Sequence, residues 1–198
     1  MTQKLAQTSA PLHELIAARW SPRAFQEKAV TPEQLTALLE AARWAPSAYN
    51  LQPWRFIVWD QHRDAANFQR AFATLSGNNQ SWAKRAPVLL GVFSDTRGPE
   101  GKVNGSAAYD TGAAVFALSL QAQALGLHLH QMGGFNREAL RDEFGLPPEI
   151  AINTLIAIGH VDDAAVIERE DLRQRELAPR ERRALDTFAF AGQWGSAS

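Results

Sequence analysis

The chain contains no cysteine, which excludes disulfides, thiolate catalysis, cysteine-bound zinc and iron–sulfur clusters. It also lacks a strong net charge: −1 at pH 7 gives no basic field that would attract nucleic acid. No apolar run is long enough for a membrane span, because the least polar stretch, 111–127, contains Ser119, Gln121 and Gln123. The first eleven residues lack the apolar core of a signal peptide. We therefore expect a soluble, cytoplasmic protein with a single domain over 1–198.

Several motifs of common enzymes are missing as well. Neither G-x-G-x-x-G nor G-x-x-x-x-G-K-[ST] occurs, so a nicotinamide cofactor would have no dinucleotide fold of its own. Ser47 lies between Pro46 and Ala48, without the glycines of a nucleophile elbow. His128 and His130 share a face if they lie on a strand, but no third metal ligand has a suitable spacing. The sequence therefore predicts no metal site, and we name no catalytic side chain.

The apolar pattern predicts helices alternating with short strands. Thr31, Pro32 and Gln34 form a capping-box start for a helix that Pro46 ends. The continuous apolar run 88–93 suits the interior of a sheet better than its edge. Strands are expected at 56–59, 88–93, 127–131 and 152–158, and helices at 12–19, 31–45, 63–74, 109–127 and 136–145. This order favours an α+β fold with a sheet flanked by helices.

Two segments are expected to need a surface outside the core. Asp110 is the only charge in the Ala-rich stretch 109–127, so this helix should be buried on most sides. A chain of this size has little core to cover such a helix, which favours a homodimer, although burial within one chain stays open. From about residue 164 a charged C-terminal arm follows, with eleven charged residues among the sixteen of 168–183. It should lie across another surface.

Two motifs carry ligand-binding chemistry. Arg19, Ser21 and Arg23 place two guanidinium groups and a hydroxyl within five residues, which suits a phosphate group. Taken alone, this run is also typical of a solvated helix end. The segment Ala45–Phe56 holds a hydroxyl and two carboxamides between two prolines, a composition that can fix donors and acceptors against a planar polar ligand.

Both motifs resemble those of the FMN-dependent nitroreductase family. The first is similar to its Arg-x-Ser-x-Arg-x-Phe opening, and the second to its Pro-Ser-x-x-Asn-x-Gln-Pro-Trp signature. The weaker matches 131–136 and 180–182 follow in the same order, and the resemblance extends over about residues 12–194. It implies a central, mostly antiparallel sheet flanked by helices, in an intertwined homodimer with two FMN sites at the interface.

The resemblance also implies residue roles. Arg19, Ser21 and Arg23 would hold the FMN phosphate and ribityl chain, and Arg180 or Arg182 would close over the phosphate. A backbone N–H of Gly133 or Gly134 would point at flavin N5; longer members often have an acidic residue where this chain has Gly133. The full set of implied cofactor-binding residues is Arg19, Trp20, Ser21, Arg23, Pro46, Ser47, Ala48, Asn50, Gln52, Asn79, Gln131, Gly133, Gly134, Arg180 and Arg182.

Within that set, Pro46, Ser47 and Asn50 would come from the other subunit, and Asn79 either contacts the ring edge or caps a loop. The implied reaction is ping-pong, with NAD(P)H as co-substrate and then a small electron acceptor such as a nitroaromatic or quinone. Tyr49, Trp82 and Phe135 either shape the acceptor pocket or belong to the core. The alternatives are a specialised reductase or dehalogenase of the same fold, and a flavin-binding module without turnover.

Overall fold

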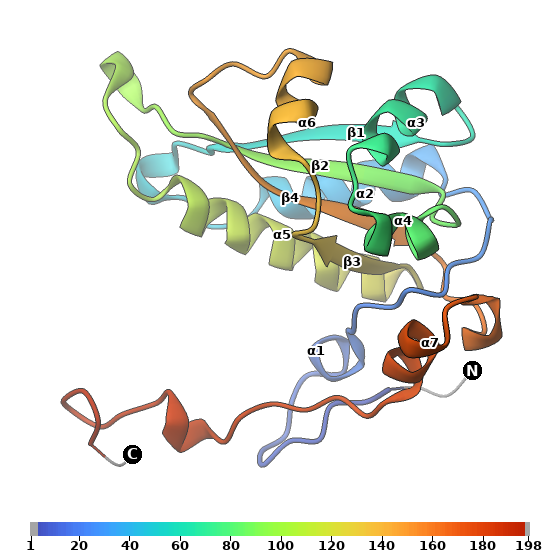
Figure 1. Ribbon diagram of the computed structural model, residues 1–198. Helices are drawn as coiled ribbons and strands as arrows, with labels where there is room; N and C mark the ends of the chain where they lie inside the picture. The colour runs from blue at the N-terminus through green and yellow to red at the C-terminus, as the bar shows by residue number, and fades with distance from the viewer. Residues whose placement is uncertain (1–3, 197–198) are drawn as a thin grey trace.

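The computed structural model describes residues 4–196; the first three and last two residues of the single domain predicted over 1–198 lie outside the described residues. A four-stranded sheet is its centre (Figure 1). The strands are β1 (Trp54–Asp60), β2 (Val88–Asp95), β3 (His128–Met132) and β4 (Ile150–Gly159). Their order is β1-β2-β4-β3 and every pairing is antiparallel, so the predicted α+β class is confirmed.

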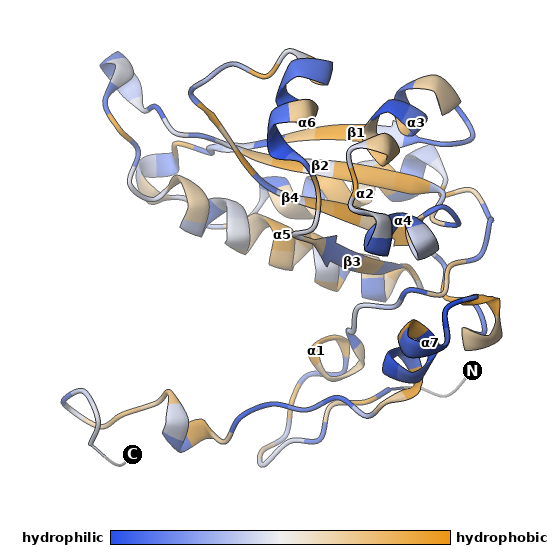
Figure 2. Cartoon of the chain, viewed as in Figure 1, coloured by the Kyte–Doolittle hydropathy of each residue, from blue (hydrophilic) through white to orange (hydrophobic). Residues whose placement is uncertain are grey.

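The two faces of the sheet bury separate apolar clusters. Because side chains alternate along a strand, Leu89 and Phe93 of β2 point to one face and Leu90 and Val92 to the other. The helices of the first face are α3 (Ala65–Ala73), α4 (Gly77–Ala83) and α6 (Arg137–Phe144). The helices of the second are α2 (Pro32–Arg43) and α5 (Ala107–Ala124). Figure 2 shows β2 and β4 as the apolar centre between these layers.

Local sequence signals account for several element boundaries. Thr31 and Gln34 form the predicted capping box of α2, with both reciprocal hydrogen bonds present. Asn136 caps α6 through a bond from Ala139 N, and Gly145 ends that helix at φ 60°, a left-handed conformation that favours glycine. The predicted interior position of residues 88–93 is confirmed, because β2 pairs with a strand on each side.

Two helices were not predicted, and a third is less buried than expected. α4 is short and polar, and α7 (Glu170–Leu177) lies in the charged run, so neither has a clear apolar stripe. On α5, Tyr109 is 82% exposed and Phe116 47% exposed, so one chain leaves an apolar face of this helix uncovered. The remaining elements are α1 (Glu14–Ala18) and 3-10 turns at Ala48–Asn50, Pro99–Gly101, Ala164–Val166 and Leu185–Thr187.

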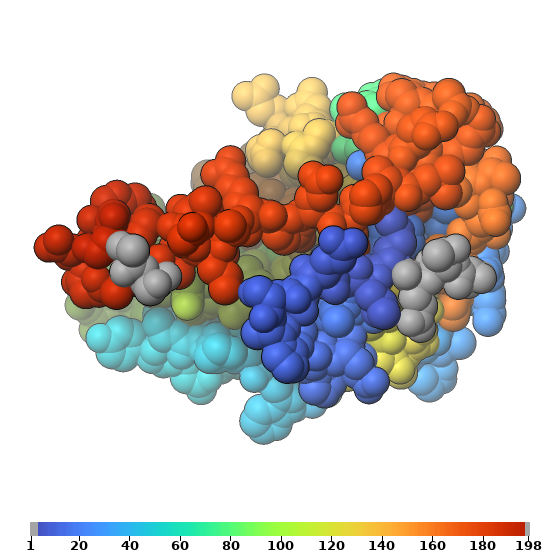
Figure 3. Space-filling model, turned by 90° about the horizontal axis from the view of Figure 1, so that it is seen from below, coloured from blue at the N-terminus to red at the C-terminus, as the bar shows by residue number. Residues whose placement is uncertain are grey.

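The described parts of both terminal segments lie on one side of the sheet and helix layers (Figure 1). Arg180 ties them together, because its Nη1 donates to the carbonyl oxygens of Lys4 (2.8 Å) and Ala17 (2.6 Å). Beyond Arg180 the arm continues across the face shown in Figure 3. Two aromatic side chains of this arm, Phe188 and Trp194, are exposed. Across residues 4–196, no helix has the length and apolar character needed to cross a membrane.

Candidate functional site

A cationic cavity of about 210 Å³ lies between the segment before α2 and the chain that follows α7. It is lined by Lys4, Arg19, Trp20, Ser21, Arg23, Arg175, Glu176, Ala178, Pro179, Arg180 and Arg182. The cavity therefore brings together six of the residues singled out from the sequence: Arg19, Trp20, Ser21, Arg23, Arg180 and Arg182. The first four are more than 150 positions away from the last two in the chain. The lining has six basic side chains but only one acidic side chain, Glu176.

The charges of this cavity are not balanced within the chain. Burial lowers the pKa of Arg19, and repulsion from Arg180 and Arg182 lowers it further. Burial also lowers the pKa of Arg23 and Lys4, with Glu176 opposing the shift in both cases. Because guanidinium groups stay protonated at any ordinary pH, the cluster remains cationic. Such a site stabilises a bound anion, for which arginine offers bidentate hydrogen bonds.

Glu176 fixes the backbone on which these arginines stand. Its side chain is only about 4% exposed; both carboxylate oxygens accept from Arg23 N at 3.0 Å, and one accepts from Ala24 N at 3.2 Å. Burial raises the pKa of this carboxyl, while the backbone donors and the Arg23 guanidinium oppose the rise. Sequence reasoning missed Glu176, because it is one acid in a run of charges and nothing local marks it as buried.

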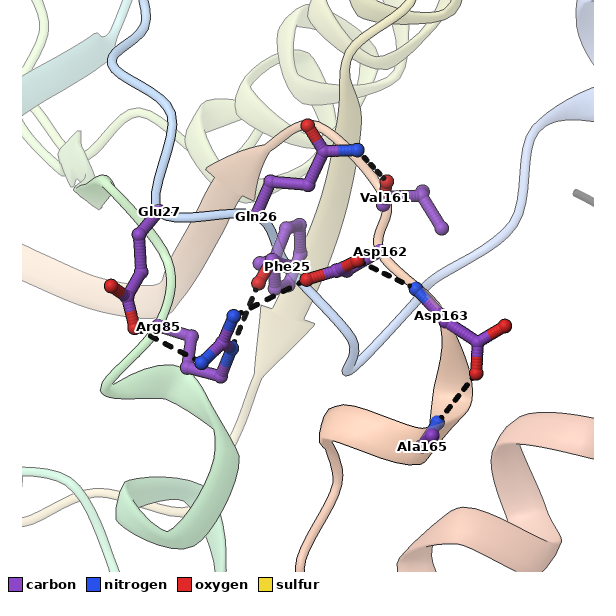
Figure 4. Close-up of polar contacts among 8 residues, drawn as sticks. All are labelled: Phe25, Gln26, Glu27, Arg85, Val161, Asp162, Asp163 and Ala165. Carbon is purple, nitrogen blue, oxygen red and sulfur yellow. Dashed lines mark hydrogen bonds and ion pairs between the residues drawn. The ribbon is translucent and has the colours of Figure 1, made fainter.

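The segment that follows Arg23 is anchored to the sheet by a second arginine (Figure 4). Arg85 Nε donates to the Phe25 carbonyl oxygen at 3.1 Å. Its two terminal nitrogens reach Glu27 Oε1 at 3.0 Å and Asp162 Oδ2 at 3.2 Å, just beyond the end of β4. This partly buried guanidinium therefore holds the cationic segment in a fixed position relative to the central sheet.

The loop 46–52 has an unusual backbone. Tyr49, Asn50 and Gln52 have φ values of 51°, 54° and 48°, in the left-handed region that L-residues other than asparagine and aspartate rarely adopt. No glycine relieves this conformation. Such strain persists only where neighbouring structure holds it in place, and it is concentrated at functional sites. Tyr49 is 96% exposed, so its side chain does not belong to the core of its own chain.

Hydrogen bonds attach this loop to the first turn of α5. Asp110 Oδ2 accepts from Ser47 Oγ at 3.1 Å and from Ala48 N at 2.9 Å. Gln52 N donates to Ser47 Oγ at 2.8 Å, and the Gln52 side chain donates to the Asn50 carbonyl oxygen at 3.1 Å. None of the loop residues Pro46, Ser47, Ala48, Asn50 and Gln52 lines the cationic cavity of their own chain. The structure therefore keeps the two main motifs apart within one chain.

The glycine pair after β3 has two different surroundings. A Cβ on Gly134 would lie 2.8 Å from Ser76 Oγ and 3.1 Å from Asn79 Nδ2, so the backbone here packs closely against these two side chains at the start of α4. Asn79 lies inside α4 rather than in a loop, and its Nδ2 donates to the Gly134 carbonyl oxygen at 3.0 Å. A Cβ on Gly133 would meet nothing within 4 Å, and Gln131 is exposed on β3. Gly133 therefore faces open space.

The aromatic and histidine side chains near β3 belong mostly to the packed interior. Trp82 is buried and lies with its ring centroid 4.5 Å from that of His130, so it is a core residue. Burial lowers the pKa of His130 to about 4, and its neutral ring donates from Nδ1 to the Pro22 carbonyl oxygen at 2.8 Å. Burial, helped by the charge of Arg19, also lowers the pKa of His128 to about 4. Both rings are neutral at pH 7.

Comparison with known proteins decides the family. The model described as Nitroreductase family matches residues 16–160. The chain belongs to the nitroreductase family. The crystal structure of an oxidoreductase containing FMN is 36% identical, covers 99% of both chains and has a TM-score of 0.91. A protein of Desulfovibrio desulfuricans, solved in complex with FMN, is 28% identical with a TM-score of 0.72 and covers 94% of this chain and 99% of its own.

Another relative is the NADH dehydrogenase of Thermus thermophilus. It is 30% identical over 174 residues, which cover 72% of this chain and 82% of the relative. The resemblance inferred from the sequence motifs is thus confirmed, and so is the nitroreductase-like fold. Among residues 4–196, no group of three or more histidine and carboxylate side chains is placed to hold a metal ion.

Proposed function

We propose that the protein is an FMN-dependent oxidoreductase that uses NAD(P)H to reduce nitroaromatics, quinones or related small electron acceptors. The observation that carries this proposal is the cationic cavity, in which residues of the two ends of the chain meet around unbalanced positive charge. Membership of the nitroreductase family supports it, as do relatives that contain FMN and one named an NADH dehydrogenase.

The donor set of this cavity fits the phosphate of FMN. Arg19, Ser21 and Arg23 would bind the phosphate and ribityl chain, with Arg180 or Arg182 closing over them. The lowered pKa values of Arg19 and Arg23 reflect a cost of burying these cations, and a bound phosphate would offset that cost. Trp20 forms part of the wall of this cavity, where the Lys4 ammonium lies 4.7 Å from its ring centroid.

The glycine turn fits the flavin ring system. Open space at Gly133 would let a planar ring lie against the backbone, and Gly133 N–H is our candidate for the donor to flavin N5. Gly134 would contribute by packing closely against Ser76, which fixes the turn. Asn79 would support the same turn from α4, and Gln131 would lie at its edge.

We further propose a homodimer in which Pro46, Ser47, Ala48, Asn50 and Gln52 reach the FMN held by the partner subunit. A groove of about 850 Å³ supports this, because it lies between the terminal segments and α5 and has a large apolar part beside its four lining arginines. Among its lining residues are Leu12, Ile16, Phe116, Leu185 and Phe188. A second copy would cover both this groove and the exposed face of α5.

Bound FMN would supply the redox chemistry, accepting hydride from NAD(P)H and passing electrons to the acceptor. The residues of the chain would bind and orient, and no side-chain acid or base is required: His128 and His130 are neutral at pH 7 and engaged in the interior. Because no dinucleotide-binding motif is present, NAD(P)H and the acceptor would use the same open face in turn. The kinetic scheme is therefore ping-pong.

Steady-state kinetics test this scheme. Rates measured with varied NAD(P)H and a quinone or nitroarene should give parallel double-reciprocal lines, with each substrate competing against the other at high concentration. Intersecting lines would mean that both substrates bind at once, which contradicts a shared face. A specialised reductase or dehalogenase would keep the parallel pattern but turn over only its own acceptor class. A flavin-binding module without turnover would hold flavin and give no rate with any acceptor.

A further inference from the structure

Asp110 is a buried carboxylate in a helix whose other residues are uncharged, so apolar packing does not account for it. It lies in the first turn of α5, is 3% exposed and is the only charged residue of that helix. Its Oδ2 accepts two hydrogen bonds from the loop 46–52, one from Ser47 Oγ and one from Ala48 N. A buried carboxylate is costly unless such donors satisfy it, so the loop and the helix are energetically linked.

The hydroxyl of Ser47 is committed within the chain. Its single proton goes to Asp110 Oδ2, while its oxygen accepts from Gln52 N at 2.8 Å. It therefore has no proton left to donate to a ligand as long as these bonds exist. Instead, the chain of bonds from Asp110 through Ser47 to Gln52 joins the two ends of the loop to α5.

This chain of bonds encloses the strained part of the loop. The left-handed residues Tyr49, Asn50 and Gln52 lie between or at its attachment points, and all three are exposed. Among residues 4–196, the remaining side-chain hydrogen bond to this loop from outside it comes from Arg55, whose Nη1 donates to the Gln52 carbonyl oxygen at 2.9 Å. Arg55 holds only the end of the loop, so the attachment of its beginning depends on Asp110.

We propose that Asp110 is a positioning residue that holds the loop 46–52, through Ser47 Oγ and Ala48 N, in the left-handed conformation that presents Asn50 to FMN. The part of this inference that concerns FMN binding rests on the proposed function. Its structural part, the restraint of the loop by Asp110, stands independently of any cofactor. The role of Ser47 is accordingly to transmit this restraint rather than to donate to the cofactor.

The test compares Asp110→Leu and Asp110→Asn with the matched control Thr111→Val. Thr111 is the next residue of α5, is equally buried, and bonds to Ser94 Oγ at 2.9 Å on the sheet side, away from the loop. Two quantities are measured on the purified protein: hydrogen exchange of the loop amides by mass spectrometry, and the FMN dissociation constant by dilution and ultrafiltration. The exchange measurement does not depend on activity.

Asp110→Leu should speed the exchange of the loop amides and weaken FMN binding, each roughly tenfold or more, because two donors lose their acceptor. Asp110→Asn keeps an acceptor oxygen and should stay within about threefold of the parent in both quantities. Thr111→Val should leave both quantities near those of the parent. If Asp110→Leu does not fold, Ser47→Ala, which breaks the same chain of bonds, should speed the loop exchange instead.

Two results would overturn the inference: loop exchange in Asp110→Leu no faster than in Thr111→Val, or Asp110→Asn as impaired as Asp110→Leu. For Ser47→Ala, the overturning result is exchange equal to that of the parent. A parent protein that binds no FMN would overturn the proposed function, while the exchange data would still decide the restraint by Asp110. Normal FMN binding by Asp110→Leu together with fast loop exchange would refute the consequence for the cofactor alone.

Discussion

At the scale of single residues, Arg19 is the side chain on which the phosphate assignment depends most. Arg19→Ala should weaken FMN retention by about one to two orders of magnitude, because a buried phosphate loses a charge-assisted partner worth about 1.5–3 kcal/mol. FMN content after extended dialysis measures the effect. Arg97→Ala, which removes an exposed arginine from the loop after β2, is the control and should keep its FMN. Equal retention by both variants would refute the phosphate assignment.

The two buried histidines make stability depend on pH. Their pKa values in the folded protein, about 4, lie below the ordinary value of 6.5, so the unfolded chain binds more protons between these limits. Their contribution to the free energy of unfolding is complete above pH 6.5 and is lost as the pH falls towards 4, on the order of 3 kcal/mol for each ring. Urea denaturation at a series of pH values measures this loss.

His130→Phe should flatten the pH dependence between 6.5 and 4, since it removes one titrating ring and keeps the aromatic contact with Trp82. An unchanged slope in His130→Phe would mean that His130 is not held neutral by burial.

At the scale of elements, α7 buries one acid, Glu176, in addition to the apolar side chain of Leu172. Glu176→Ala should lower the free energy of unfolding by about 2–4 kcal/mol, because the amides of Arg23 and Ala24 lose their acceptor. Glu170→Ala, in the first turn of the same helix, removes an exposed acid and should cost less than about 1 kcal/mol. Urea denaturation of both variants makes the comparison. Equal losses would contradict the backbone-fixing role of Glu176.

Elements with a local signal could be predicted from the sequence, and those held by tertiary contacts could not. The capping box at Thr31 marks the start of α2, and Asn136 and Gly145 mark the two ends of α6; both signals are local in the sequence. α4 and α7 lack an apolar stripe, and they form because Trp82 and Leu172 pack into the cluster on one face of the sheet.

The candidate site divides in the same way. Arg19, Ser21 and Arg23 could be found because their spacing suits a phosphate and matches a family motif. Asp110 carried a signal, as the single charge of an apolar helix, although its partner Ser47 lies 63 positions away. Glu176 carried none, because which acid of a charged run becomes buried depends on the path of the whole chain.

At the scale of the whole molecule, the proposed FMN site needs residues of two chains. Light scattering at micromolar concentration should give a flavin-loaded species of about twice 21.8 kDa, because in the proposed dimer the partner would supply part of each FMN site. Phe116→Glu, on the exposed face of α5, should lower the dimer fraction and the flavin content together. Ala66→Glu, on the exposed face of α3 in the opposite layer, should change neither. A flavin-loaded species near 21.8 kDa would contradict the dimer.

In the proposed function the chain passes electrons from NAD(P)H to an acceptor through FMN, and anaerobic spectroscopy is the sharpest test of this transfer. The purified protein should be yellow, with two flavin absorption bands that survive desalting. NAD(P)H added without oxygen should bleach these bands quickly, and a quinone added after the nicotinamide has been removed should restore them. A protein that takes up no FMN, or whose flavin bands are unchanged by both NADH and NADPH, would contradict the claim.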